Sequence, residues 1–277
     1  MKLKNDTKSN TKINPKILIF DIETMASVAW TWAENMYETG LIEIIKPGLV
    51  IGYSAEWLGT GEVKTKTWSD YQGYTPYKTL GAYIISPPND DKAIVRDIWE
   101  LLNQANMVVV QNGQAFDLRY INSRFVYYGL PPLKPNQVVD TKKAFKKYLK
   151  LPSYSLDNIS EYYGLGRKKE HEGWGLWKRV ILGNIKAIRK MKQYNRHDVV
   201  LTKEIYLKIR PFVREHPNMN LMMGTELRCR NCGSRDLMRQ GKRYNLRGIS
   251  QQFSCKECGA WGSVPLDKDE IIKGKIR

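Results

Sequence analysis

The stretch KILIFDIET, at residues 16–24, decides the fold of the chain. Its apolar, β-prone residues predict a central strand, since short apolar runs of this kind are typical of strands buried in a sheet. Asp21 and Glu23 lie within the run at positions i and i+2. Because the side chains of a strand alternate between its faces, both carboxylates point to the same side of the sheet. A buried carboxylate needs a cation or hydrogen-bond donors, so the pair indicates either a metal site or carboxylates satisfied by backbone amides or a lysine.

Strand and helix patterns continue outward from this run. Further strands are predicted at residues 50–58, 63–68, 107–110 and 137–139. Helices are predicted at residues 91–105, 118–125, 141–149 and about 184–209. Strands that come first and then alternate with helices predict an α/β or α+β sheet protein.

Two more acidic residues lie far along the chain. Asp117 stands at the start of a predicted helix, where it would also serve as an N-cap. Asp198 follows Tyr194 by four residues in the last predicted helix, so both side chains face the same way. Carboxylates gathered from one strand and two helices repel one another unless metal lies between them, and oxygen ligands favour Mg²⁺ or Mn²⁺. The sequence therefore predicts a two-metal site for phosphodiester cleavage, with Tyr194 orienting the attacking water.

Two other acidic residues are interpreted as helix caps. Asp140 precedes the helix predicted at residues 141–149, and Asp157 opens a later helical segment. Asp is favoured at N-caps, because its carboxylate accepts hydrogen bonds from free backbone amides. Asp140 has a second interpretation, as a fifth acidic residue of the metal site.

All four cysteines lie near the C-terminus, in two Cys-x-x-Cys-Gly turns. The turns supply Cys229, Cys232, Cys255 and Cys258, with 22 residues between the second and the third. Four thiolates at this spacing predict one Zn²⁺, and a site with four cysteine ligands is structural because no coordination position stays open. The alternatives are a redox disulfide pair or unpaired buried cysteines.

The charge of the chain indicates a polyanionic partner. Lys and Arg number 45 against 28 Asp and Glu, which gives a net charge of +17. Nucleic acid is the first partner to expect and an anionic membrane surface the second. No run of about 18 apolar residues is present, so no membrane span is expected. The few cysteines and the polar N-terminal stretch argue against an exported disulfide scaffold, and we expect a cytoplasmic protein.

Several basic, aromatic and amide side chains are candidates for contact with nucleic acid. They are Asn112, Lys143, Lys147, Arg239, Arg243 and Tyr244. Cations that follow phosphates, interleaved with rings that stack on bases, suit single-stranded nucleic acid. The alternatives are solvated charged faces and, for the cysteine-rich segment, a surface that docks protein.

Three motifs together resemble one family. FDIET at residues 20–24, QNGQAFD at 111–117 and YNRHD at 194–198 look like the DEDD (DnaQ-like) 3′→5′ exonuclease superfamily. The Tyr-x-x-x-Asp form is similar to its y-type branch, since the h-type branch has His where this chain has Gln193. The similarity extends over about residues 15–266, to prokaryotic and phage RNase H-like proteins with a terminal zinc ribbon. Gln111 departs from the pattern, because many relatives have His there.

The resemblance implies a fold, a reaction and a set of residues. The fold would be α/β, an RNase H-like mixed sheet flanked by helices, with a small C-terminal zinc ribbon of four cysteines. Asp21, Glu23, Asp117 and Asp198 would bind two Mg²⁺ or Mn²⁺ ions, and Tyr194 would position water. The enzyme would release nucleoside 5′-monophosphates from 3′ ends, of single-stranded DNA first and of RNA second, in a bacterium or a phage-infected cell.

We expect five segments. They are a mobile basic leader at residues 1–14, an RNase H-like exonuclease domain at 15–212, a linker at 213–224, the zinc ribbon at 225–266 and a basic tail at 267–277. Two other functions fit the same sequence: a nucleic-acid-binding adaptor without catalysis, and a structure-specific endonuclease of the same fold. No feature of the sequence identifies a protein partner.

Overall fold

The computed structural model describes residues 15–32, 42–87, 91–169, 172–224, 226–246 and 248–266. The predicted leader and the predicted basic tail lie outside the described residues. The chain divides into two compact units, Lys16–Tyr206 and a second unit that contains Leu207–Arg277. The segment boundaries expected from the sequence stay predictions.

The first unit is built on a five-stranded mixed sheet. Its strands are β1 (Ile17–Thr24), β4 (Val50–Trp57), β5 (Val63–Thr67), β6 (Met107–Val110) and β7 (Gln137–Asp140). The order across the sheet is β5-β4-β1-β6-β7. The central strand β1 is antiparallel to β4 and parallel to β6. The α/β fold and the mixed sheet predicted from the sequence are confirmed.

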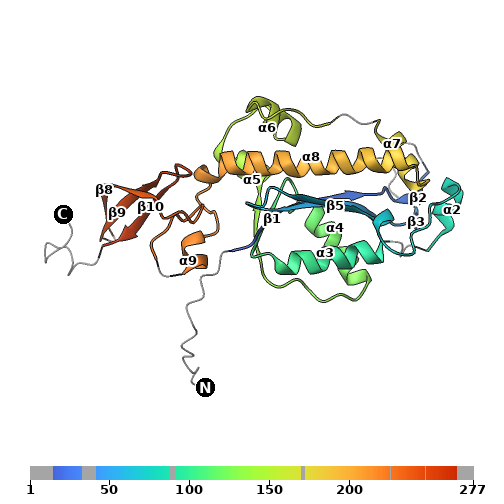
Figure 1. Cartoon of the computed structure of the whole chain (residues 1–277), viewed down its shortest axis with the longest axis horizontal. Helices are drawn as coiled ribbons and strands as arrows, with labels where there is room; N and C mark the ends of the chain where they lie inside the picture. The colour runs from blue at the N-terminus through green and yellow to red at the C-terminus, as the bar shows by residue number, and fades with distance from the viewer. Residues whose placement is uncertain are drawn as a thin grey trace, which may run out of the picture. The chain divides into compact units, whose positions relative to one another are not determined.

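Helices cover both faces of this sheet (Figure 1). They are α2 (Leu80–Ile85), α3 (Lys92–Gln104), α4 (Asp117–Tyr127), α5 (Thr141–Tyr148), α6 (Leu156–Tyr162), α7 (Trp174–Ile181) and α8 (Ile185–Ile209), with a 3-10 turn η1 (Trp68–Asp70). α3 and α4 lie on one face, and α8 runs along the other (Figure 1). In the described part of the chain, no helix is both long and apolar enough to cross a membrane.

The alternation of side chains along β1 separates core from site. Leu18, Phe20 and Ile22 are buried in one hydrophobic cluster with residues of α3 and α4. Their neighbours Asp21 and Glu23 therefore face the side of the sheet that carries α8. The strand predicted from KILIFDIET thus fixes one apolar face and leaves two acidic groups on the other.

A buried ion pair ties three elements of the first unit together. Asp91 is fully buried at the N-terminus of α3, and it accepts hydrogen bonds from the backbone N–H of Val50 (2.9 Å) and from Nε of Arg124 (2.9 Å). Tyr128 donates to the same carboxylate. One carboxylate therefore joins α3, β4 and α4 beneath the sheet.

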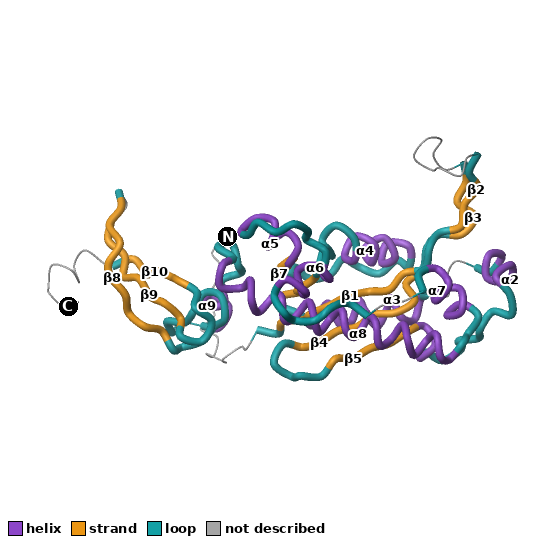
Figure 2. The backbone as a smooth tube through the Cα atoms, turned by 90° about the horizontal axis from the view of Figure 1, so that it is seen from above, coloured by secondary structure: helices purple, strands orange, loops and turns teal. Residues whose placement is uncertain are grey.

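Two short strands after β1 were not predicted from the sequence. β2 (Val28–Trp30) and β3 (Glu43–Lys46) form a separate two-stranded sheet, which projects away from the main one (Figure 2). Trp30 and Trp32 are exposed there. Lys46 is buried, and its Nζ lies 2.6 Å from Oγ of Ser86 and 4.3 Å from the ring centroid of Tyr83. This lysine anchors the base of the projection.

The second unit contains a small antiparallel sheet. Its strands β8 (Leu237–Asn245), β9 (Gly248–Cys255) and β10 (Trp261–Pro265) are arranged in the order β10-β9-β8. The stretch predicted as a linker contains a short helix, α9 (Met219–Met223). Asn231 Nδ2 donates a hydrogen bond to the carbonyl of Arg210 (2.6 Å), within the short 3-10 turn η2 (Arg210–Phe212).

Breaking the buried pair should destabilise the first unit. Replacing Arg124 by Met leaves the Asp91 carboxylate buried without its cation, which costs about 3–5 kcal/mol of unfolding free energy. Urea denaturation followed by circular dichroism measures the change. Arg96→Met is the matched control, because Arg96 is exposed on α3 and its loss should cost less than about 0.5 kcal/mol. Equal stability of the two variants would contradict the role given to the pair.

Candidate active site and cysteine site

The central strand places two carboxylates beside α8. Asn195 of α8 is almost fully buried, and its Nδ2 donates a hydrogen bond of 2.6 Å to Oδ2 of Asp21. The Asn195 side chain also interacts with Glu23 and opposes the rise in the pKa of that carboxyl. This hydrogen bond joins residues 174 positions apart in the sequence and fixes the direction of the Asp21 carboxylate.

The loop after β6 brings a third carboxylate to the same strand. Oδ1 of Asp117 accepts a hydrogen bond of 3.1 Å from the backbone N–H of Ile22, which lies between the two acidic residues of β1. Asp140 holds the loop, because its carboxylate accepts from the N–H groups of Asn112 (3.0 Å) and Gln114 (3.1 Å). Asn112 has a φ of 63°, and this left-handed backbone conformation belongs to the loop whose N–H groups donate to Asp140.

Asp140 is also the N-cap of α5, as predicted, since it accepts from the N–H of Lys143. The prediction that Asp157 caps a helix was wrong. The N-cap of α6 is Ser155, whose hydroxyl accepts from the N–H of Asn158 (3.2 Å). Asp157 instead accepts from the backbone N–H of Lys168 at 2.8 Å.

The fourth carboxylate belongs to α8 and has a lysine against it. Oδ2 of Asp198 lies 2.5 Å from Nζ of Lys168. The Tyr194 hydroxyl interacts with both side chains, and the lysine Nζ lies 4.9 Å from the tyrosine ring centroid. Trp177 packs edge-on against the same ring at 6.4 Å and donates a hydrogen bond to the carbonyl of Thr24 at the end of β1.

The pKa values show that the carboxylates interact. Burial, and then the charges of Asp117, Glu23 and Asp198, raise the pKa of Asp21 well above its usual value. Burial and the charge of Asp198 raise the pKa of Glu23 to about 8, and burial raises the pKa of Asp117 to about 6. Burial also raises the pKa of Asp198, against the opposing effect of Lys168. Like charges that disfavour one another's ionised forms create a demand for a cation.

The chemistry of the group fits a divalent ion. The donors are carboxylate oxygens, which suit Mg²⁺ and Mn²⁺. Oδ1 of Asp198 and Oδ1 of Asn195 are buried and have no hydrogen-bond partner among the described residues. No three of the carboxylates, in the part of the chain that the structure describes, have oxygens all within 4.8 Å of one another. The carboxylates thus interact electrostatically without forming a closed ligand set.

Sequence reasoning missed two residues of this site. Lys168 lies in a basic run that predicts a surface in contact with phosphate or, alternatively, a solvated face, and Asn195 lies between two motif residues of YNRHD. Their importance arises from contacts across the fold, so no local pattern distinguishes them. His197, the neighbour of Asp198, donates from Nε2 to the carbonyl of Arg167 (2.9 Å) and supports the loop that carries the lysine.

The predicted nucleic-acid contacts lie in both units. Lys143 is engaged with Oε1 of Gln114 at 2.7 Å, and Lys147 lies 5.8 Å from the ring centroid of Tyr148. In the second unit, β8 carries three exposed candidates, which are Arg239, Arg243 and Tyr244. Asn112 uses its backbone for the turn before Asp117. Contact of these residues with nucleic acid stays a prediction.

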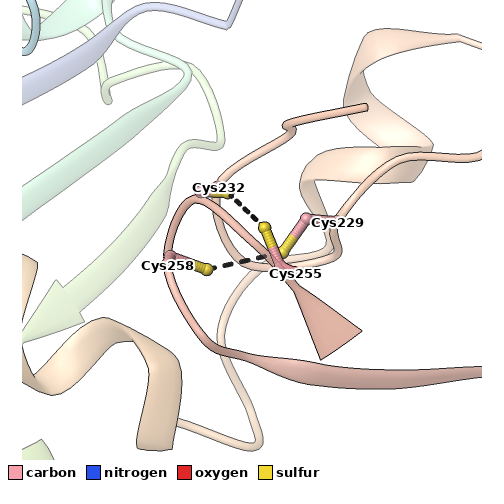
Figure 3. A group of neighbouring side chains, drawn as sticks. All are labelled: Cys229, Cys232, Cys255 and Cys258. Carbon is pink, nitrogen blue, oxygen red and sulfur yellow. Dashed lines mark hydrogen bonds between the residues drawn. The ribbon is translucent and has the colours of Figure 1, made fainter. Parts of the chain in front are cut away.

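The four cysteines converge in the second unit (Figure 3). Their sulfur atoms all lie within 4.8 Å of one another. The pairs Cys229–Cys258 and Cys232–Cys255 are 3.7 and 3.6 Å apart, well beyond the about 2.05 Å of a disulfide. Each turn closes through a glycine of positive φ, Gly233 (78°) and Gly259 (77°). The cluster has the geometry of a metal site with four cysteine ligands.

Comparison with known proteins gives three findings. A family model described as the RNase_H superfamily matches residues 65–210, more than half of the chain. A PolC-type DNA polymerase III from Ureaplasma parvum serovar 3 is 25% identical over 202 residues, which are 71% of this chain but 13% of that polymerase. The solved family B DNA polymerase of the archaeon Pyrobaculum calidifontis is 12% identical with a TM-score of 0.46, over 84% of this chain and 31% of the polymerase.

Removing one carboxylate should stabilise the metal-free protein. The pKa of Glu23 is raised from 4.5 to about 8, so ionisation of Glu23 destabilises the folded state. The free energy of unfolding therefore falls as the pH rises through this range. In EDTA above pH 8, Glu23→Gln should therefore gain about 0.5–2 kcal/mol over wild type, and near pH 4.5 the gain should vanish. Urea titrations at both pH values measure it. Glu100→Gln, on the exposed side of α3, is the control and should change little at either pH.

Proposed function

Because the chain belongs to the RNase H superfamily, we propose that it is a metal-dependent 3′→5′ exonuclease that releases nucleoside 5′-monophosphates from nucleic acid. The observation that carries the proposal is the convergence of Asp21, Glu23, Asp117 and Asp198 from β1, α4 and α8. A protein that only bound nucleic acid would gain nothing from buried carboxylates that repel one another and would repel phosphate. A cleavage site gains a place for divalent cations.

Asp21, Glu23, Asp117 and Asp198 would hold two Mg²⁺ or Mn²⁺ ions. When bound, such ions generate hydroxide from water near neutral pH and stabilise charge on the attacking and leaving oxygens of the phosphodiester. The chain positions three of these ligands through groups already in place. Asn195 holds Asp21, and the N–H of Ile22 holds Asp117. Lys168 contacts Asp198.

Tyr194 would position the attacking water. Burial and the charge of Asp198 raise its pKa to about 12, so the phenol keeps its proton and donates a hydrogen bond. Trp177 restrains the ring from one side and is itself fixed to the end of β1 by its indole N–H. The hydroxyl is thus held beside the carboxylates of β1 and α8.

Polarity and substrate rest on resemblance. The motifs FDIET, QNGQAFD and YNRHD look like those of DEDD exonucleases of the y-type, which act from 3′ ends. A DNA polymerase III among the similar proteins favours DNA as the substrate, with RNA as the second choice. Single strands are favoured because a 3′ end must leave its duplex to reach buried carboxylates.

The second unit would bind one Zn²⁺ and contact the substrate. Its four thiol groups surround one point, and the neighbouring Cys232 thiol lowers the pKa of Cys229 to about 4, so a thiolate is available. β8 presents Arg239 and Arg243 together with Tyr244, whose side chain is 70% exposed. Charges that pair with phosphates and a ring that stacks on a base would give affinity without sequence preference.

Loss of a ligand should abolish cleavage, and loss of the tyrosine hydroxyl should slow it. With 3′- and 5′-labelled single-stranded DNA and Mg²⁺, wild type should release mononucleotides from the 3′ end and Asp21→Asn should release none. Tyr194→Phe should lower kcat by about 100-fold or more while binding Mn²⁺ as tightly as wild type. Tyr162→Phe, an exposed tyrosine of α6, is the matched control.

The same assay separates the other functions. Cutting of circular single-stranded DNA would identify an endonuclease. Binding of DNA without product, in Mg²⁺ or in Mn²⁺, would identify an adaptor. Mononucleotide release at an unchanged rate by Tyr194→Phe would exclude that hydroxyl from the mechanism.

Loss of the basic residues of β8 should weaken binding more than catalysis. The triple variant Arg239→Ala/Arg243→Ala/Tyr244→Ala should bind single-stranded DNA with a lower affinity, and the slope of log K against log salt should fall by about 0.7 for each phosphate that the variant no longer neutralises. Filter binding at several salt concentrations measures both. At saturating DNA the rate of mononucleotide release should stay near that of wild type.

Two other cations of the second unit provide the control. Arg235 and Lys256 already pair with Glu226 and Asp236, so Arg235→Ala/Lys256→Ala should change affinity less. If this double variant loses as much affinity as the triple variant, net charge and not β8 accounts for binding.

A further inference from the structure

Lys168 is the one ammonium group that contacts a carboxylate of the candidate site in the described residues. Its Nζ lies 2.5 Å from Oδ2 of Asp198, and 29% of the side chain is exposed. It also interacts with the Tyr194 hydroxyl and with the charges of Asp21 and Glu23. A single ammonium group therefore lies among four carboxyl groups.

Both sides of the peptide that carries this lysine are fixed. The carboxylate of Asp157 accepts from the backbone N–H of Lys168 at 2.8 Å. The ring of His197 donates to the carbonyl of Arg167 at 2.9 Å, and the guanidinium of Arg167 pairs with Asp157 at 3.2 Å. Contacts from α6 and α8 thus fix the backbone of Lys168, and the ammonium contacts Asp198 from this fixed position, in contrast to the freely moving side chain of a surface lysine.

The contact divides the two oxygens of Asp198. Oδ2 is occupied by the ammonium, and Oδ1 is buried with no hydrogen-bond partner among the described residues. A carboxylate held by one oxygen presents the other in a fixed direction. Asn195 holds Asp21 in this way, and the backbone N–H of Ile22 on β1 holds Asp117. The lysine is therefore placed to orient this ligand and to neutralise part of the cluster.

We propose that Lys168 is the resident counter-cation of the site: it stabilises the acidic cluster while no divalent ion is bound, and it opposes the binding of that ion. The inference rests on the proposed function, because it assumes that the carboxylates bind Mg²⁺ or Mn²⁺. An ammonium and a divalent ion that share Asp198 repel each other, so each weakens the binding of the other. Lys168 is thus a positioning residue that sets how tightly the free enzyme holds metal.

The experiment measures metal binding in the absence of nucleic acid. Full-length wild type and Lys168→Met are freed of divalent ions with EDTA, which is then removed by dialysis, and Mn²⁺ is added while thermal unfolding and free Mn²⁺ (by electron paramagnetic resonance) are followed. Lys168→Met should have a lower Tm than wild type without metal, a larger rise in Tm with Mn²⁺, and a Kd for Mn²⁺ that is smaller by on the order of tenfold. Lys168→Arg keeps the charge and should behave like wild type.

Two variants complete the test. Lys169→Met removes the adjacent exposed lysine and should leave both Tm and Kd unchanged. Lys168→Gln keeps a polar group against Asp198 and should also tighten Mn²⁺ binding, which preserves the test if the methionine variant does not fold.

The outcomes separate the two proposals. If Asp21→Asn binds as much Mn²⁺ as wild type does, or if neither protein binds any, these carboxylates form no metal site and the proposed function is wrong. The other outcome is that wild type binds Mn²⁺ through Asp21, but Lys168→Met and Lys168→Gln bind it as tightly as wild type or more weakly. The nuclease proposal then stands, and the role of Lys168 as a counter-cation is wrong.

Discussion

Repulsion between buried carboxylates is the constraint on which the rest of the first unit depends. β1 must be apolar on the face that packs against α3 and α4, yet its other face carries Asp21 and Glu23 toward α8. Asp117 and Asp198 add two more charges from other elements. Burial and mutual repulsion raise the pKa values of the group, and folding is possible because an amide, a backbone N–H and an ammonium meet individual oxygens.

Other carboxylates serve the site without belonging to it. Asp140 closes the loop before Asp117 by accepting from two of its backbone amides, and Asp157 fixes the backbone of Lys168. Asp91 joins α3, β4 and α4 on the opposite side of the sheet. The same chemical group therefore has two uses in this fold. A carboxylate saturated by N–H donors stiffens the scaffold, whereas one with an oxygen left over is available to a cation.

The sequence predicted those features that depend on local pattern. The alternation of KILIFDIET predicted β1 and the common face of its carboxylates, and Asp140 was identified as the cap of α5. Ser155, not Asp157, caps α6, because capping depends on which residue directly precedes the helix. β2 and β3 were missed because their exposed Trp30 lacks the buried alternation of a core strand. Lys168 and Asn195 gain meaning through tertiary contacts, which no local spacing encodes.

The cysteine site and the carboxylate site differ in how far they can form before metal arrives. The neighbouring Cys229 and burial raise the pKa of Cys232, and burial raises the pKa of Cys258, so these two thiols keep their protons without metal. The four sulfur atoms can therefore lie within 4.8 Å of one another and share hydrogen bonds. Carboxylates packed as closely as these thiols would repel one another, which raises their pKa values. The carboxylates of the first unit therefore lie farther apart than the thiols, and Asp198 contacts Lys168. A closed thiolate cage suits an ion that never leaves. An open group of oxygens suits ions that must accept water and phosphate, as the proposed phosphodiester cleavage requires.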